Sequence, residues 1–247
     1  STAFYTQLTD SPLARLHVLI ETTPGKLPEV DETALEEHIA ARANIWSDAL
    51  RDAVLTEFGD EAGTPIVQSF KDAFPPAYIN NTSAGGAAKD IRRVFESLDG
   101  DGLAVEIFRE KNSPADVLHL NCFTRDVNAE LSATIPSLEH MGATVIDATP
   151  YVLTPLPPLS PVLLRNFTLR IAGASSLNLA EHKARIEQAI CRIWRGETDD
   201  DYFNALVFAA NLSARDVEIL RAYSRYLQQL DFPYSQQFMA AALTSHA

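Results

Sequence analysis

Hydrophobic residues along this chain recur with two different periods, which predicts a mixture of strands and helices. Near the amino end, apolar and polar residues alternate over Phe4–Thr9 and Leu13–Glu21, the period of two that is typical of half-buried strands. From Asp31 to Phe58 apolar residues instead return every three, four or seven positions, which indicates an amphipathic helix capped by Asp31. At about 1.5 Å per residue this helix is roughly 40 Å long, so we interpret it as a connector.

The middle of the chain carries the most regular pattern. The expected elements are a helix through Ile91 and Leu98, strands at Leu103–Arg109 and Val117–Thr124, a helix capped by Ser132 and ended by Gly142, and a strand at Ala143–Ala148 that continues over Tyr151–Leu153. This order supplies five of the six elements of a ferredoxin-like βαββαβ unit. The alternating segment from Leu163 to Ile171 is the candidate for the missing first strand. We therefore expect a four-stranded antiparallel sheet with helices.

Shorter helical patterns surround this block. We expect a helix over Pro65–Phe74, a polar boundary from Asn80 to Gly86, and a bundle of about four helices from Asn178 onward. In that bundle, Asn178 with Glu181 and Ser213 with Asp216 have the spacing of capping boxes. The predicted fold class is thus α+β, divided into a hairpin over residues 1–28, a helical connector over 29–82, an α+β domain over 83–174 and a helical bundle over 175–247.

Composition narrows the class of protein. Among 247 residues there are 33 acidic and 20 basic side chains, a formal net charge of −13 that argues against a nucleic-acid partner. Every apolar run is too short for the roughly 18–20 residues of a membrane span, so we expect no membrane partner. Two cysteines, Cys122 and Cys191, cannot build a disulfide scaffold and fit a reducing, cytoplasmic compartment. The chain begins at Ser1, which is typical either of a piece of a longer protein or of a processed terminus.

A search for catalytic motifs predicts no catalytic, metal-binding or cofactor-binding residues in this chain. Gly100-Asp101-Gly102 precedes a strand and lacks a third glycine, so it reads as a turn and not as a dinucleotide-binding loop. His119 and Cys122 fall on opposite faces of one strand, which argues against a nucleophile–base pair. The acidic run from Glu197 to Asp201 could bind a cation, but we interpret it as solvated carboxylates at a helix start.

Several strings nevertheless resemble, in their order, one enzyme family. They are Ser11–His17, Asp72–Pro75 with Tyr78, Leu138–Gly142 followed by Val145–Asp147, Trp194–Gly196, Leu220–Tyr223 and Phe232–Gln236. Together they resemble the segment ahead of the catalytic domain in the large bacterial NAD-specific glutamate dehydrogenases. The resemblance covers Ser11 to about Met239, and the Pro-rich stretch Pro155–Pro161 departs from it.

The resemblance implies a non-catalytic regulatory and architectural segment of such an enzyme, whose NAD site and catalytic residues lie elsewhere. Residues 1–28 would end a truncated ACT-like module and 83–174 would form the next, complete one. ACT-like units can hold an amino acid, and a candidate effector loop is Asn81, Ser83, Gly85 and Gly86, although we favour the alternative that the two glycines are only a flexible boundary. Expected partners are the rest of the parent chain, further copies in a homo-oligomer and an amino-acid effector. The alternative is a purely structural oligomerisation module without a ligand.

Overall fold

The computed structural model describes residues 2–7, 15–20, 31–128, 130–172, 174 and 177–246. The chain divides into two units, residues 1–45 and 46–247, and each is described by itself. In the first, β1 (Thr2–Gln7) and β2 (Arg15–Ile20) pair antiparallel, with Thr2 opposite Ile20. This confirms the two predicted strands, whereas the part of the predicted hairpin that joins them lies outside the described residues.

The long helix predicted from the apolar stripe is present as α1 (Glu32–Phe58). The backbone N–H of Thr33 donates to the carboxylate of Asp31 at 3.1 Å, so Asp31 caps this helix as predicted. Gly59 follows with a φ of +80°, a left-handed conformation that favours glycine and ends the helix. The next helix, α2 (Asp60–Phe70), begins at once with two acidic residues in its first turn. The predicted helix over Pro65–Phe74 was therefore placed too late.

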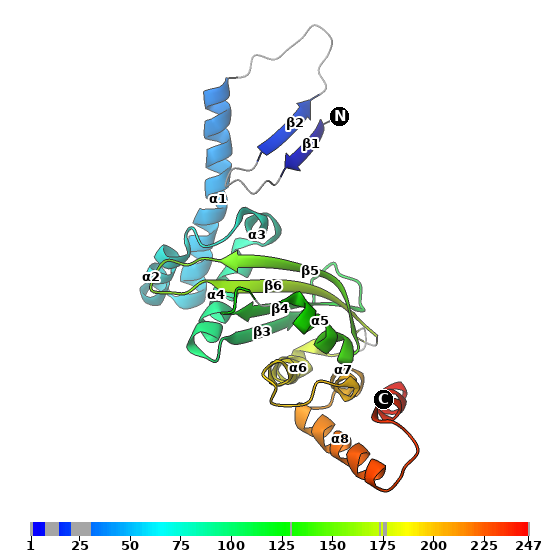
Figure 1. The fold of residues 1–247 in the computed structure, drawn as a ribbon. Coiled ribbons are helices and arrows are strands. Elements are labelled where there is room, and N and C mark those ends of the chain that lie inside the picture. Colours follow the sequence, from blue (N-terminus) through cyan, green and yellow to red (C-terminus); the bar gives the residue numbers. More distant parts are fainter. Residues whose placement is uncertain are drawn as a thin grey trace. The chain divides into compact units, whose positions relative to one another are not determined.

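The second unit is built on the predicted four-stranded antiparallel sheet, in the spatial order β3-β4-β6-β5 (Figure 1). Its strands are β3 (Leu103–Phe108), β4 (Val117–Thr124), β5 (Ala143–Leu153) and β6 (Val162–Ile171). β6 pairs with β4 on one side and with β5 on the other, so the segment predicted as the missing strand takes a central place. β5 runs unbroken through Pro150, which an outer strand tolerates because one side of it is unpaired.

The sheet separates two hydrophobic cores, one on each of its faces. On one face, β4 and β6 contribute Leu118, Leu120 and Phe167 to a core shared with α5 (Leu131–His140) and α6 (Leu179–Trp194). On the other face, Phe123 and Leu164 join a core built with α1, α2, α3 (Pro76–Asn81) and α4 (Ala84–Asp99). Side chains of β4 alternate between the two faces, with Leu118, Leu120 and Cys122 in the first core and Phe123 in the second, and nearly the whole strand is buried.

This arrangement changes which helix completes the ferredoxin-like unit. From its place before β3, α4 was expected to be the first helix of that unit. However, α4 packs on the opposite face from α5, whereas α6 shares the face of α5 and lies against β3. The unit therefore runs β3-β4-α5-β5-β6-α6, a circular permutation in which the first strand and first helix come last. The amide N–H of Ile107 on the β3 edge donates to Glu187 of α6 at 2.9 Å, which satisfies one backbone donor of that edge.

The C-terminal residues form the expected group of helices, drawn in yellow to red in Figure 1. After α6 come a short 3-10 turn (Tyr202–Ala205), α7 (Leu206–Ala209), α8 (Ala214–Gln229) and α9 (Gln236–Ser245). The capping box of Ser213 and Asp216 is confirmed, with the side chain of each residue bonded to the backbone of the other. No helix among the described residues is long and apolar enough to cross a membrane.

Two predicted caps are wrong. Asn178 donates to the carboxylate of Glu181 at 3.2 Å and makes no side-chain bond to the helix backbone. Ser132 lies inside α5, which begins after Glu130, and its hydroxyl donates to the Glu130 carboxylate. In both places a side-chain pair replaces the expected side chain–backbone bond. Correct residue types at correct spacing therefore do not establish a cap.

Candidate functional site

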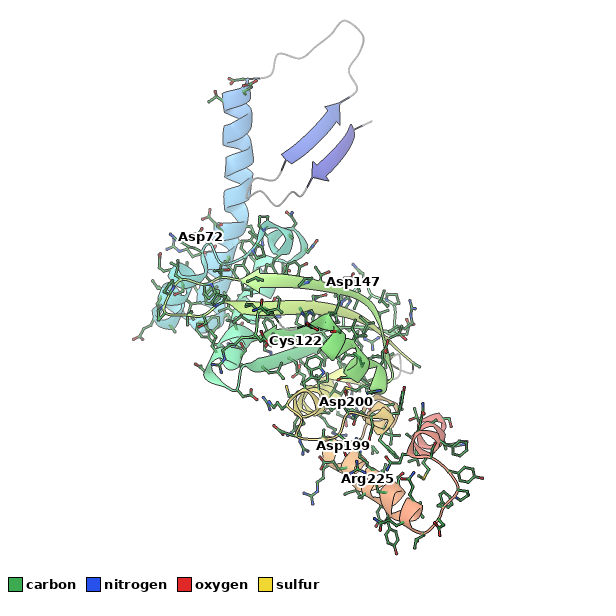
Figure 2. The ribbon with its side chains drawn as sticks, viewed as in Figure 1. Asp72, Cys122, Asp147, Asp199, Asp200 and Arg225 are labelled. Carbon is green, nitrogen blue, oxygen red and sulfur yellow. The ribbon has the colours of Figure 1, made fainter. Side chains whose placement is uncertain are left out.

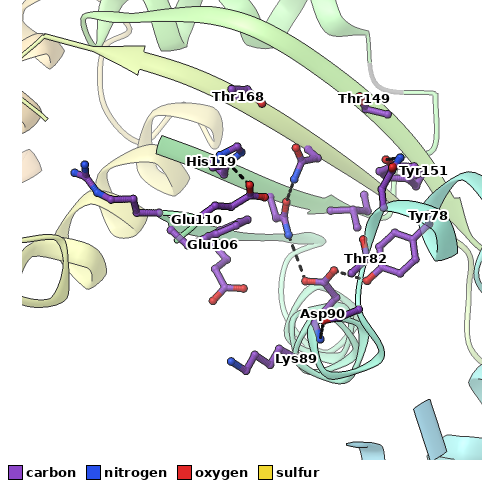
Figure 3. A pocket seen from close by; sticks show the side chains of 18 residues that line it. Tyr78, Thr82, Lys89, Asp90, Glu106, Glu110, His119, Thr149, Tyr151 and Thr168 are labelled. Carbon is purple, nitrogen blue, oxygen red and sulfur yellow. Dashed lines mark hydrogen bonds and ion pairs between the residues drawn. The ribbon is translucent and has the colours of Figure 1, made fainter. Parts of the chain in front are cut away.

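A cavity of about 650 Å³ lies in the second unit, between one face of the sheet and the junction of α3 and α4 (Figure 3). Its walls are mainly polar. The helices contribute Tyr78, Asn81, Thr82, Ser83, Gly86, Lys89 and Asp90, and the strands with their flanking residues contribute Glu106, Phe108, Arg109, Glu110, His119, Asn121, Thr149, Tyr151, Leu164, Asn166 and Thr168. A cavity with several converging polar groups is the usual form of a small-molecule site.

Asp90 is the centre of a buried hydrogen-bond network in the cavity wall. Only 6% of Asp90 is exposed. The hydroxyl of Tyr78 donates to its Oδ2 at 2.6 Å, and the amide of Asn121 donates to its Oδ1 at 3.3 Å. Asn166 in turn donates to the Asn121 side chain at 2.7 Å. Figure 3 shows the Asp90 carboxyl group pointing from α4 toward the strands, with Tyr78 beside it.

This environment changes the acidity of both partners. Burial raises the pKa of Asp90 to about 6, because the charged form loses its hydration, and the hydrogen bonds from Tyr78 and Asn121 only partly offset the effect. Burial and the nearby Asp90 carboxylate raise the pKa of Tyr78 well above its ordinary value, so the phenol remains a donor. A carboxyl group that titrates near neutral pH in the wall of a cavity is typical of functional sites.

The cavity includes three of the four residues of the predicted effector loop. Asn81, Ser83 and Gly86 line it, while Gly85 is absent from its lining. The segment is not a loop, however. Asn81 ends α3, Ser83 caps α4 by accepting from the Gly86 amide at 3.2 Å, and both glycines lie in the first turn of α4. The prediction of a polar boundary without helical structure was wrong because Ser83 starts a new helix only two residues after α3 ends.

Sequence reasoning missed the residues that make the cavity distinctive, namely Asp90, Tyr78, Asn121 and His119. One signal was available for Asp90. It lies three positions after Ala87 and four before Val94, on the apolar side of α4, where a charged residue is unexpected. His119 and Asn121 likewise alternate with buried leucines on β4. Polar residues at apolar positions thus marked the site.

The remaining candidate residues have structural roles. Cys122 is buried on the opposite sheet face from His119, as predicted, and burial raises the pKa of its thiol to about 12 (Figure 2). Among the described residues, no group of three or more His, Cys, Asp or Glu side chains is placed to hold a metal ion. Asp199 and Asp200 are exposed and Asp201 caps the following 3-10 turn, as the interpretation of solvated carboxylates at a helix start expected, but all three are also engaged by other side chains. Asp201 and Asp199 bind arginines of α8, and Asp200 binds Ser137 and His140 of α5.

Comparison with known proteins connects these elements to one family. Four models of glutamate dehydrogenase regions match consecutive parts of the chain: the ACT2 domain at residues 1–47, helical motif 2 at 53–98, the ACT3 domain at 102–182 and helical motif 3 at 198–247. The NAD-specific glutamate dehydrogenase of Halomonas elongata is 35% identical over 243 residues. This chain belongs to the glutamate dehydrogenase family.

The chain spans only a small part of its glutamate dehydrogenase relatives. The match to the Halomonas elongata protein covers 98% of this chain and 15% of that protein. The NAD-specific enzymes of Pseudomonas aeruginosa and Mycobacterium tuberculosis are each 27% identical, over 98% of this chain and 15% and 16% of their own lengths. The matched regions are ACT domains and helical motifs, as the resemblance implied. The predicted limits at residues 28, 82 and 174 stay a prediction.

Within this glutamate dehydrogenase segment, the cavity lies where two family regions meet. Tyr78, Gly86 and Asp90 come from the part matched by helical motif 2, and the strand residues come from the part matched by the ACT3 domain. The two parts are also joined by a shared core and by the bond from Asn121 to Asp90. A ligand in the cavity would therefore contact both regions.

We expect Asp90 to make the glutamate dehydrogenase segment more stable as the pH is lowered from about 7 to about 5. The folded-state pKa of about 6 exceeds the unfolded value near 3.9, so in this window the folded chain binds the additional proton. The contribution is fully present below about pH 4 and is lost as the pH rises through 6, with a slope of at most about 1.4 kcal/mol per pH unit.

Urea unfolding at a series of pH values measures this effect. Because histidines also titrate in this range, the informative quantity is the difference between the wild-type chain and Asp90→Asn. As the pH falls from about 7 to about 5, the free energy of unfolding should increase more in the wild-type chain than in the variant. Parallel pH dependences of the two chains would contradict the assignment.

Proposed function

We propose that this chain is a non-catalytic regulatory and architectural segment of an NAD-dependent glutamate dehydrogenase. The parent enzyme would oxidatively deaminate L-glutamate to 2-oxoglutarate with NAD, and the segment would act in the cytoplasm on the catalytic part of the same chain. Support comes from the match to ACT domains and helical motifs and from relatives that are named NAD-specific glutamate dehydrogenases.

The regulatory part of the proposal is that the cavity binds an amino-acid effector. The observation that carries it is the buried Asp90 carboxyl group in the cavity wall, opposite hydroxyl and amide side chains of the sheet. Lys89, in the same wall, is exposed and makes no hydrogen bond or ion pair with any described residue, so it could receive a carboxylate. An amino acid has both an ammonium group, which would bind Asp90, and a carboxylate, which would bind Lys89. A ligand that binds more tightly when helical motif 2 and the ACT3 domain have one relative arrangement would shift the linked enzyme toward the state with that arrangement.

Isothermal titration calorimetry with the common L-amino acids, one at a time, tests this function on the chain. We expect one or a few of them to bind, and we expect Gly86→Val to weaken that binding. A Cβ at Gly86 would meet the Thr82 side chain at 3.1 Å in the cavity wall, so the wall must shift. Gly85→Val is the matched control, because a Cβ at Gly85 has no atom within 4 Å and Gly85 does not line the cavity.

The outcomes separate clearly. Equal binding by the wild-type chain and both variants would exclude this wall of the cavity as the site. Absence of binding by every amino acid would remove the effector from the proposed function and leave the architectural role. Circular dichroism of each variant shows whether the helical content of the chain is retained.

A purely structural module that sets the oligomeric state is the second candidate, and one feature favours it. An apolar groove of about 360 Å³ lies on α8 and α9, lined by rings and aliphatic chains that include Tyr223, Phe232, Tyr234 and Phe238. Tyr223 and Phe238 are 65% and 54% exposed. Exposed apolar patches of this kind often mark interaction sites. Sedimentation analysis distinguishes the candidates, because association that is abolished by Tyr223→Lys, without amino-acid binding, would favour the structural module.

A further inference from the structure

The Asp90 carboxyl group is buried in the cavity wall without a cationic partner. It accepts hydrogen bonds from Tyr78 and Asn121, and no lysine or arginine among the described residues forms an ion pair with it. Buried carboxylates in proteins are usually paired or coordinated, because transferring an unpaired charge out of water is costly. A carboxylate has room for about four hydrogen bonds, and only two are made here. The site therefore has unused acceptor capacity at Asp90, and neither Lys89 nor Arg109 of the cavity lining forms an ion pair with it.

The surrounding charges do not supply a cationic partner for Asp90. On α4 itself, Arg93 pairs with Glu96 at 2.7 Å and points toward Glu106 and Glu187. Lys183 of α6 binds Glu106 at 2.8 Å, which leaves that β3 carboxylate already neutralised.

No other ionisable group around Asp90 among the described residues forms an ion pair with it, and Arg109 of the cavity lining donates to the backbone carbonyls of Ala115 and Ala174. Tyr78 of α3 and Tyr151 of β5 are phenols, and His119 of β4 is bonded to Ser113 at 2.9 Å. Glu110, after β3, lies 3.7 Å from His119, and Lys89 extends from α4 into the exposed part of the wall. Asp90 is thus the buried, unpaired carboxyl group of the cavity.

We propose that the ammonium group of the amino-acid effector binds the Asp90 carboxylate in place of the proton that this group carries at low pH, so that effector binding to the protonated form releases one proton to the solvent. This inference rests on the proposed function and adds the orientation of the ligand and its regulation by pH. The ammonium group keeps its own protons and donates to the free lone pairs of Asp90. Tyr78 and Asn121 hold the carboxylate in position through the bonds they already donate.

The coupling has a defined direction. With a pKa of about 6 in the free chain, Asp90 is mostly ionised at pH 7.5 and mostly protonated at pH 5. The carboxyl and ammonium groups of a free amino acid keep their charges throughout this range. Binding should therefore be weakest at low pH: Kd should rise about fivefold from pH 6 to pH 5 and approach a tenfold rise per pH unit below that. A cell that acidifies would lose the effector from this site.

The experiment is calorimetry of the 247-residue chain with the amino acid that binds best, at about pH 5, 6 and 7.5. We expect Kd to be about tenfold higher at pH 5 than at pH 7.5. At pH 6, titrations in two buffers with different ionisation enthalpies should reveal proton release, which is read independently of affinity and without any variant. The N-acetylated form of the same amino acid lacks the ammonium group and should not bind.

Three variants separate Asp90 from its neighbours. Asp90→Asn should weaken binding at pH 7.5 and remove its pH dependence. His119→Gln and Glu110→Gln should retain the pH dependence of binding. His119→Gln is the stricter control, because histidine is the other side chain that changes charge in this pH range. A pH dependence that vanishes in His119→Gln and persists in Asp90→Asn would overturn the proposal. Binding of the amino acid without proton release at pH 6 would overturn it and leave the proposed function intact, whereas no binding at any pH would overturn it together with the effector part of the proposed function.

Discussion

Replacing Arg221 with methionine should destabilise the C-terminal helices by about 3 kcal/mol, because it breaks a buried ion pair and leaves its partners unsatisfied. Arg221 lies on α8 and is only 2% exposed. Its guanidinium group donates to both carboxylate oxygens of Asp201, at 2.7 and 3.0 Å, and to the side chain of Asn204 at 2.9 Å. It also donates to the backbone carbonyl of Asp199 at 3.2 Å. Methionine fills a similar volume and makes none of these bonds.

Arg225→Met is the matched control. Arg225 lies one turn further along α8, is about half exposed and binds Asp199 at 2.6 Å (Figure 2). Exposed ion pairs contribute about 1 kcal/mol or less, so this variant should lose far less stability. Urea unfolding followed by circular dichroism compares the two. Similar losses in both variants would mean that Arg221 does not organise the acidic segment.

Replacing Phe167 with alanine should cost about 3–5 kcal/mol, the range for removing a large aromatic side chain from a packed core. Phe167 is fully buried on the central strand β6 and lies opposite Leu120 of β4 and Ala148 of β5. It belongs to the core that the sheet shares with α5 and α6. The cavity left by the ring would adjoin both neighbouring strands.

Val152→Ala provides the comparison for this substitution. Val152 lies on the outer strand β5 and is 46% exposed, so its loss should change the free energy of unfolding by about 0.5 kcal/mol or less. The midpoint of urea unfolding, monitored by the fluorescence of the tryptophans, measures both variants. A small effect of Phe167→Ala would contradict the central position of β6 in the sheet.

Several elements whose signals are local were predicted well, although the caps at Asn178 and Ser132 were not. The strand Val117–Thr124 was placed with the observed limits, and the helix ended by Phe58 has the expected cap and stop. Ser213 and Asp216 form the predicted capping box. Each of these depends on residues within about four positions of one another, where the backbone period and the capping geometry are set by sequence neighbours.

Elements that depend on distant partners were predicted poorly. We assigned α4 to the ferredoxin-like unit because it precedes β3 in the chain. The apolar stripe of a helix, however, does not determine which face of a sheet the helix packs against. The acidic run Asp199–Asp201 looked like a solvated helix start until Arg221, some twenty residues away, was brought against it. The predicted effector segment reached the cavity through Asn81, Ser83 and Gly86, yet the group that distinguishes the cavity was missed.

The sequence by itself determined the α+β class, the strands, the long helix and the family of this protein, because periodicity and ordered motifs are properties of neighbouring residues. Only the tertiary structure decided that Asp90 is a buried, unpaired carboxyl group. Its partner Asn121 lies 31 positions away, and Asn166 lies another 45 positions beyond that. The burial of Asp90, and the raised pKa that follows from it, arise only when α4 packs against the sheet. Desolvation is a property of the assembled core and not of any single segment.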